Sequence, residues 1–189
     1  MKQLEERILR DGRVLPGGIL KVDGFLNHRI DPQLLFDMAQ ELRRLYAGEE
    51  INKILTIEAS GIAIGAMVGY VFGCPLLFAK KSKTRNIADG VWSAEVESFT
   101  HGNTSTVLVS KEYLGPGDRV LIVDDFLATG AALVGLRSLC EQAGAAVVGA
   151  GIAIEKVFQG GGDKLRAEGL RIESLARIAA MSDDSVTFC

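Results

Sequence analysis

The sequence predicts a single α/β domain, residues 1–189, with a central, mostly parallel sheet flanked by helices. The first observation is the run Val120–Val123, whose β-branched and aliphatic residues suit a strand that is buried on both faces. The second is residues 53–79, where a strand pattern, a turn, a helical stretch and another strand pattern follow in order. Strand-helix-strand units of this kind build parallel sheets.

The other elements follow from hydrophobic spacing and helix caps. Residues 2–10 form an amphipathic pattern that Gly12 stops, and Asp31-Pro32 supplies an N-cap and a first-turn proline for a helix through Tyr46. Gly160–Gly162 is interpreted as a turn. The expected strands are 53–58, 75–79, 120–123, 147–155 and 171–178, and the expected helices are 2–10, 32–46, 62–72 and 131–143.

Composition narrows the class of protein. Lys plus Arg number 21 against 24 for Asp plus Glu, so the net charge of −3 offers no general attraction to nucleic acid or to a membrane. The three cysteines lie far apart, which is typical of a reducing compartment. The N-terminal residues lack the apolar core of a signal peptide. We therefore expect a cytoplasmic protein without nucleic-acid or membrane partners.

Residues 54–79 are apolar enough to suggest a membrane span, yet they include a glutamate, a proline and four glycines. A soluble strand-helix-strand unit is the better interpretation. The glycines at 61, 65, 69 and 73 are four residues apart, so they share roughly one helix face. Either the sheet or a partner subunit could approach that face closely.

The pair Asp124-Asp125 follows the buried strand, at the carboxyl end where ligands of open α/β sheets bind. The loop Phe126–Gly130 then leads into a helix near Ala131, whose unpaired N–H groups and positive dipole end favour a phosphate. The hydroxyl of Thr129 can add a donor. An Asp pair can also be a simple turn former, but the whole pattern favours a phosphate-and-ribose site.

This pattern resembles the phosphoribosyl diphosphate (PRPP) loop of the type I phosphoribosyltransferases. The resemblance implies the type I phosphoribosyltransferase fold, with a small N-terminal hood, about residues 1–30, over the active site. It also implies that the catalytic pair Asp124 and Asp125 contacts the ribose 2′- and 3′-hydroxyls. The residues implied for the 5′-phosphate are Ala128, Thr129, Gly130, Ala131 and Ala132.

Two positions of this loop depart from many relatives. Ala132 stands where Thr or Ser is common, so backbone amides must replace one side-chain contact to the phosphate. Ala128 stands where hypoxanthine-guanine relatives carry an Asp, which is their supposed proton acceptor. The sequence therefore names no general base.

The resemblance places pyrophosphate at two further strand ends. The turn after the strand 53–58 would offer the amides of Ala59, Ser60 and Gly61, and Lys80 and Lys81 would supply positive charge. Taken alone, a Ser-Gly turn is usually a helix cap and a charge run is usually a solvated surface. Residues 80–104 mix polar, glycine and strand-like positions, which suggests a flexible flap that closes over PRPP and excludes water.

The chain is similar along nearly its whole length to bacterial members of the family that use xanthine. The similarity includes Leu20–Asp23, Phe25–His28 and Ile154–Lys156. It implies that Leu20, Asn27 and Lys156 contact the purine. Without this similarity, we would interpret Leu20 as a core residue, Asn27 as a turn former and Lys156 as a surface lysine. The candidate apolar walls of the purine pocket are Leu20, Phe25, Phe126 and Leu127.

The implied activity is transfer of the phosphoribosyl group from PRPP to xanthine, giving xanthosine 5′-monophosphate and pyrophosphate. Mg²⁺ would be bound mainly through PRPP, with no ligand directly from protein side chains, and a homodimer is expected. Two alternatives remain open. A hypoxanthine/guanine enzyme would differ only in base preference. A PRPP-binding regulator of purine genes is less favoured. Such proteins carry a DNA-binding segment before this domain, and the roughly thirty residues before the Asp31 helix contain no such pattern.

Overall fold

The computed structural model describes residues 1–82, 90–97, 104–182 and 185–189. The strands are β1 (Arg13–Leu15), β2 (Ile19–Lys21), β3 (Lys53–Ile57), β4 (Leu76–Ser82), β5 (Val91–Glu97), β6 (Thr104–Ser110), β7 (Arg119–Leu127), β8 (Ala146–Lys156), β9 (Ile172–Met181) and β10 (Val186–Phe188). The helices are α1 (Lys2–Asp11), α2 (Pro32–Leu45), α3 (Ser60–Phe72), α4 (Ala131–Ala143) and α5 (Gly161–Ala167), with short turns η1 (Asp23–Asn27) and η2 (Val157–Gln159).

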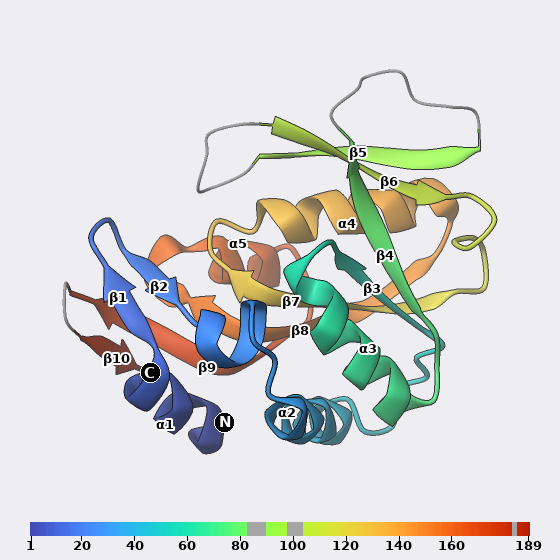
Figure 1. Cartoon of the computed structure of the whole chain (residues 1–189). Coiled ribbons are helices and arrows are strands. Elements are labelled where there is room, and N and C mark those ends of the chain that lie inside the picture. The colour runs from blue at the N-terminus through green and yellow to red at the C-terminus, as the bar shows by residue number, and fades with distance from the viewer. Residues whose placement is uncertain (83–89, 98–103, 183–184) are drawn as a thin grey trace.

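An eight-stranded sheet of order β10-β9-β8-β7-β3-β4-β6-β5 forms the centre of the fold (Figure 1). The strands β9, β8, β7, β3 and β4 run parallel to one another. Antiparallel pairings of β10 with β9, of β6 with β4 and of β5 with β6 extend the sheet at both edges. β1 and β2 form a separate antiparallel hairpin. The predicted α/β class with a mostly parallel central sheet is therefore confirmed.

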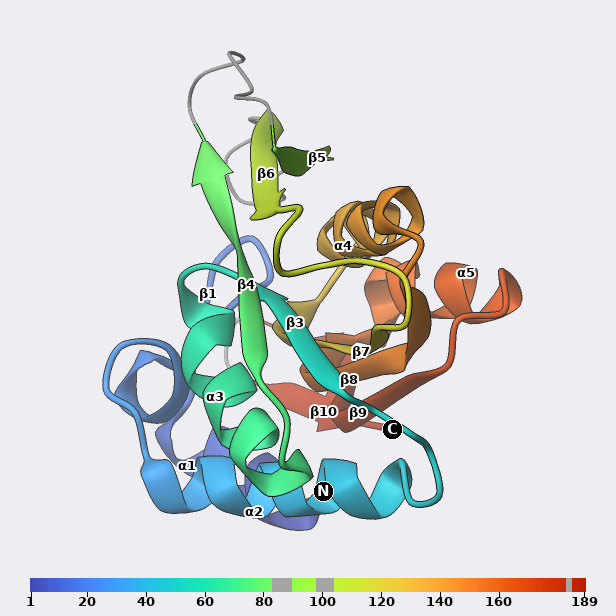
Figure 2. The same ribbon diagram turned by 90° about the vertical axis from the view of Figure 1, so that its right-hand side faces the viewer.

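Helices cover both faces of the sheet, with α1, α2 and α3 on one face and α4 and α5 on the other (Figure 2). The alternation along β7 explains why both faces are apolar. Leu121 and Val123 join the core cluster beneath α2 and α3, whereas Val120 and Ile122 join the cluster beneath α4. This confirms the prediction of a strand buried on both faces.

Most predicted elements are confirmed, including the α2 cap, where the Asp31 side chain accepts a hydrogen bond from the Leu34 N–H. Four strands are longer than predicted, and two of these extensions, those of β7 and β4, change where predicted site residues lie. β7 continues to Leu127 because β8 runs beside it and pairs with it as far as Glu155. β4 continues to Ser82 because β6 pairs with its last residues. Asp124 and Asp125 therefore lie within a strand rather than beyond it.

The hairpin β1–β2, the strand β6, the edge strand β10 and the helix α5 were not predicted from the sequence. Gly160–Gly162 was expected to be a turn, but only Gly160 has the left-handed conformation, with φ of 75°, and α5 begins at Gly161. Each missed element is short, and each depends on contacts with distant parts of the chain. Local spacing carries little information about such elements.

The glycine face of α3 packs on the chain's own sheet. A Cβ at Gly65 would lie 2.7 Å from the Leu76 side chain, and one at Gly69 would lie 2.8 Å from the Cys74 carbonyl oxygen. Of the two expected uses of this face, the structure shows sheet packing, so these glycines give no support to a homodimer. None of the helices in the described residues is long and apolar enough to cross a membrane.

The described part of the segment 80–104 comprises the end of β4, the strand β5 and the start of β6. β5 lies over α4, where a Cβ at Gly135 would collide with Val96, and Gln142 Nε2 donates to the Ser93 carbonyl oxygen over 2.8 Å. Residues 83–89 and 98–103 lie outside the described residues. The flexible flap therefore remains a prediction.

Candidate active site

The candidate site is a cavity of about 670 Å³ at the carboxyl ends of β3 and β7. These two strands pair only as far as Leu55 and Ile122, and the helices that follow them pack on opposite faces of the sheet. Such a point is where ligands bind in open α/β sheets. The lining residues are Ile19, Leu20, Asn27, Ile57, Glu58, Ser60, Lys81, Val96, Ser105, Val107, Asp124, Asp125, Phe126, Leu127, Ala128, Thr129, Gly130, Ala131, Ala132, Leu133 and Lys156.

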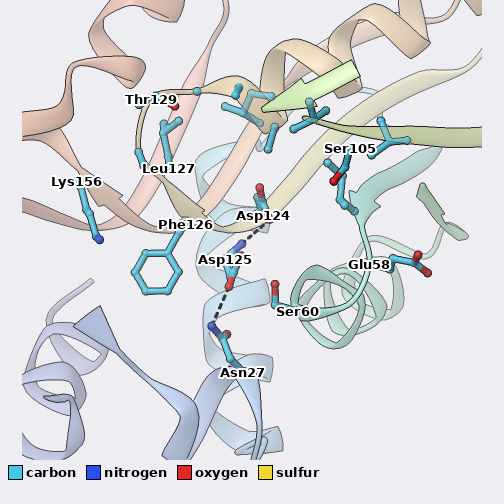
Figure 3. Close-up of a pocket in the computed structure, with 18 of the residues that line it drawn as sticks. Asn27, Glu58, Ser60, Ser105, Asp124, Asp125, Phe126, Leu127, Thr129 and Lys156 are labelled. Atoms are coloured by element: carbon cyan, nitrogen blue, oxygen red, sulfur yellow. Dashed lines mark hydrogen bonds between the residues drawn. The ribbon is translucent and has the colours of Figure 1, made fainter. Parts of the chain in front are cut away.

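The acid pair lies at the centre of this cavity (Figure 3). Asp124 is 7% exposed, and its Oδ1 accepts a hydrogen bond of 3.0 Å from the Asp125 N–H. Burial, together with the adjacent carboxylate of Asp125, raises the pKa of Asp124 well above its ordinary range. A ligand that brings hydroxyl donors or positive charge would stabilise the carboxylates of this pair and is therefore favoured here.

The loop after the acid pair turns at Gly130, whose φ of 89° is left-handed and favours glycine. α4 begins at the next residue, so the first amides of the helix face the cavity between Thr129 and Leu133. Its positive dipole end adds a favourable potential for an anion. All five residues predicted for the 5′-phosphate line the cavity.

The residues predicted to contact the purine lie in the same cavity, although they come from opposite ends of the chain. Asn27 Nδ2 donates to Asp125 Oδ2 over 2.9 Å, and Asn27 Oδ1 is buried without a hydrogen-bond partner among the described residues. Lys156 Nζ donates to the Gly18 carbonyl oxygen over 2.8 Å and lies 5.6 Å from the centre of the Phe126 ring. Burial lowers the pKa of Lys156. Figure 3 shows Lys156 and Phe126 on one side of the acid pair and Ser60 on the other.

The residues predicted for pyrophosphate divide into two groups. Ser60 and Lys81 line the cavity, whereas Ala59, Gly61 and Lys80 are not among its lining residues. Lys80 and Lys81 are consecutive in β4, so their side chains point to opposite faces of the sheet. The prediction placed both lysines beyond the end of the strand, where both could face the pyrophosphate. Because β4 extends to Ser82, only Lys81 of the two lines the cavity.

Phe25 was predicted as a wall of the purine pocket, but it is fully buried in the core cluster that also holds side chains of α1 and α2. The cavity also includes residues that the sequence did not single out, such as Glu58, Val96 and Ser105. Glu58 Oε1 accepts a hydrogen bond of 2.6 Å from the Lys81 N–H and so ties the end of β3 to β4. The position of Glu58 beside the turn Ala59–Gly61 was the one sequence feature that could have indicated its place in the cavity.

The raised pKa of Asp124 has a consequence for the stability of the ligand-free protein. A carboxyl whose folded-state pKa is raised stabilises the fold below its unfolded-state pKa, and that contribution is lost as pH rises through the folded-state pKa. The Asp124→Asn variant is therefore expected to gain stability over the native protein as pH rises. Urea unfolding at a series of pH values measures the difference.

The control is Gln40→Asn on α2, because Gln40 is exposed and has no titratable group. Its stability relative to the native protein should be nearly independent of pH. A pH-independent difference for Asp124→Asn would show that burial does not hold a proton on this carboxyl.

Comparison with known proteins agrees with this geometry. Residues 24–166 match the family model of the phosphoribosyl transferase domain, and the chain belongs to this family. It is 56% identical to a xanthine phosphoribosyltransferase of Finegoldia magna, with 100% of this chain and 99% of that protein covered. It is 52% identical to the xanthine phosphoribosyltransferase of Brevibacillus brevis, with 100% and 96% covered.

Solved structures of the family show the same fold. An adenine phosphoribosyltransferase of Thermoanaerobacter pseudethanolicus is 27% identical, with a TM-score of 0.74 over 92% of this chain and 99% of that chain. The adenine phosphoribosyltransferase of Giardia lamblia, at 24% identity, gives a TM-score of 0.80 over 94% and 98%. The type I phosphoribosyltransferase fold expected from the sequence is confirmed.

Proposed function

We propose that this protein transfers the 5-phosphoribosyl group of PRPP to xanthine and forms xanthosine 5′-monophosphate and pyrophosphate. The observation that carries the proposal is that one cavity joins the acid pair and its phosphate loop to Asn27 and Lys156. The two relatives above 50% identity that are named xanthine phosphoribosyltransferases support the choice of purine.

In the proposed complex, the acid pair accepts hydrogen bonds from the ribose 2′- and 3′-hydroxyls. The loop from Ala128 to Ala132 holds the 5′-phosphate with its amides and the helix dipole. The diphosphate would lie toward Ser60 and Lys81, with the turn amides of Ala59 and Gly61 and the charge of Lys80 as further candidates. Positioning and electrostatics would supply most of the catalysis.

The two purine contacts differ in what they can recognise. The Lys156 ammonium is a donor without an acceptor, so it suits an oxygen or an unprotonated ring nitrogen and leaves an exocyclic amino group unmatched. This argues against adenine as the substrate. Asn27 offers both a donor and an acceptor, which a dioxopurine can use. Leu20, Phe126 and Leu127 provide apolar surface for the ring.

The reaction forms a bond between C1′ of the ribose and a ring nitrogen of xanthine and breaks the bond from C1′ to the diphosphate. The proton of that nitrogen is released to water as the new bond forms, and pyrophosphate leaves with the electron pair of the broken bond. Mg²⁺ would enter with PRPP and be bound mainly through its oxygens, because this ion keeps several waters and is held largely by substrate phosphates. No group of three or more potential ligands is found in the described part of the chain. Bound with PRPP, the ion would neutralise diphosphate charge.

An acid placed at position 128 should bring little benefit with xanthine. The ring of xanthine loses its proton comparatively readily, so the reaction needs no strong base from the enzyme. We expect kcat of the Ala128→Asp variant with xanthine to stay within about threefold of the native value, whereas a required general base contributes about 10²–10⁴-fold. Steady-state assays at saturating PRPP measure this. A large rate gain would contradict the proposal that no base is needed.

The proposed function is tested by an ultraviolet assay of the purified protein with PRPP and Mg²⁺, offering xanthine, guanine, hypoxanthine and adenine in parallel. A strong preference for xanthine would support the proposal and the purine-contact roles. Preference for hypoxanthine or guanine would retain the PRPP site and overturn the purine assignment. PRPP binding without turnover of any base would point to a regulator.

We also propose a cytoplasmic homodimer with a single catalytic domain and an N-terminal hood. The separated cysteines support a reducing compartment, and the resemblance to the family supports the dimer. Light scattering of the purified protein, with and without PRPP, measures the mass directly. A monomer under both conditions would contradict the dimer.

A further inference from the structure

A fully buried carboxylate lies next to the proposed purine lysine, but outside the cavity. Glu155 is the neighbour of Lys156 in β8, and both of its oxygens are bound by the guanidinium of Arg166 at 2.7 Å. Ser174 Oγ donates to it over 2.6 Å, and the Nε of Arg177 lies 3.4 Å away. Neither Glu155 nor Arg166 is among the described residues that line the cavity.

Arg166 belongs to α5, and α5 begins directly against the proposed phosphate loop. The Gly161 N–H donates to the Ala128 carbonyl oxygen over 3.2 Å. A Cβ at Gly161 would collide with that carbonyl and with the backbone of Thr129. One turn further along α5, the Leu165 side chain lies 2.9 Å from the point where a Cβ of Gly130 would stand. The helix therefore supports the loop from the side away from the cavity.

α5 spans Gly161–Ala167, and its first two residues are glycines. Glycines disfavour helix, and a helix of this length is not stable in isolation. Its place must come from tertiary contacts, and the two-pronged bond between Arg166 and Glu155 is its strongest polar contact with the sheet.

We propose that Glu155 and Arg166 are positioning residues for the 5′-phosphate loop. The ion pair fixes α5 against β8, and α5 fixes the backbone of Ala128, Thr129 and Gly130 through Gly161 and Leu165. This inference rests on the proposed function, because it assumes that the loop binds the 5′-phosphate. It implies that the pair affects ligands with a 5′-phosphate and leaves pyrophosphate binding alone.

The test compares ligand affinities of Arg166 variants. For Arg166→Met, we expect the Kd of ribose 5-phosphate and the KM for PRPP to rise by about ten- to hundredfold, since a small misplacement of a binding group has effects of this size. The Kd of pyrophosphate should stay within about twofold, because its proposed site lies at other strand ends. Arg166→Lys keeps the charge but loses the planar fork, so it should lie between the native protein and Arg166→Met.

Gly161→Ala should displace the same loop without altering the ion pair. It should therefore weaken binding of ribose 5-phosphate and PRPP while leaving pyrophosphate binding unchanged. Lys53→Met is the matched control. Lys53 pairs with Asp118 at 2.7 Å, but at the opposite end of β3, so this variant should lose stability and keep every ligand affinity. If Arg166→Met does not fold, Arg166→Lys decides the question.

Equal weakening of ribose 5-phosphate and pyrophosphate, or no change in either, would overturn the positioning role. A native protein that binds no ribose 5-phosphate would instead overturn the proposed function, and this inference would fall with it. The two failures are distinguishable, because the first is confined to the variants.

Discussion

Asp125→Asn is expected to lower kcat/KM for PRPP by about 10²- to 10⁴-fold. In the proposed complex, the carboxylate of Asp125 accepts hydrogen bonds from ribose hydroxyls, and a hydrogen bond to a charged group contributes about 1.5–3 kcal/mol. Two such bonds account for about 3–6 kcal/mol, and each 1.4 kcal/mol corresponds to about tenfold. Steady-state kinetics at varied PRPP and saturating xanthine measure the loss.

The fold should survive this change. Asparagine has nearly the shape of aspartate, and its amide oxygen can still accept the hydrogen bond that Asn27 now donates to Asp125 Oδ2 over 2.9 Å. The loss should therefore appear in kinetics and PRPP binding rather than in the melting temperature. Asp37→Asn on α2 makes the same chemical change at a half-buried position outside the cavity and should leave kcat/KM unaltered. A native-like kcat/KM for Asp125→Asn would remove this residue from the ribose site.

The same variant should shift the acid limb of the pH profile. After burial, the charge of Asp125 is the next cause of the raised pKa of Asp124, so removing that charge should lower the pKa of Asp124. If catalysis needs the ionised carboxylate of Asp124, activity is lost as pH falls through the pKa of Asp124. The activity of Asp125→Asn, although lower, should therefore persist to a lower pH than the activity of the native enzyme. An acid limb at the same pH in both proteins would contradict coupling within the pair.

The features that could be predicted from the sequence are those that depend on neighbouring residues. The buried run Val120–Val123, the Asp31 cap and the helix that begins at Ala131 each follow from local spacing and cap chemistry, and all are present. The strand-loop-helix pattern also predicted where the acid pair and the phosphate loop would lie. The roles of these residues came from resemblance, because geometry alone permits other anions.

Features that depend on distant contacts were not predictable in this way. The reach of β7 to Leu127 depends on β8, and the opposite orientations of Lys80 and Lys81 depend on pairing between β4 and β6. By its apolar character Phe25 could be a pocket wall or a core residue, and its packing with side chains of α1 and α2 places it in the core. The contact of Gly161 with Ala128 joins two segments whose proximity no local pattern indicates.

Arg166→Met should be the most destabilising of the substitutions considered. It leaves the carboxylate of Glu155, which is fully buried, with only Ser174 and the more distant Arg177 as partners. Breaking a buried pair from one side costs about 3–5 kcal/mol, because an uncompensated charge remains. Glu155→Gln should cost less, about 1–3 kcal/mol, because the remaining Arg166 is 29% exposed and can reach water. Urea unfolding of both variants at neutral pH measures the difference.

The dependence on pH distinguishes a charge effect from a loss of packing. Burial by itself would raise the pKa of Glu155, but the hydrogen bonds from Arg166 and Ser174 outweigh it and hold the pKa below the ordinary value of 4.5. A lowered carboxyl pKa contributes stability that is present above the unfolded-state pKa and lost as pH falls through the folded-state pKa. Without Arg166, burial should raise the pKa of Glu155, so protonation relieves the buried charge at a higher pH.

The loss of unfolding free energy in Arg166→Met, relative to the native protein, should therefore be largest at neutral pH and shrink toward pH 4.5. Glu155→Gln has no buried charge to relieve, so its loss should shrink only as far as the native ion pair itself weakens. A deficit for Arg166→Met that is constant across this range would mean that the side chain stabilises α5 by packing alone. The phosphate loop would then be supported by the contacts of Gly161 and Leu165 without a contribution from the buried charge.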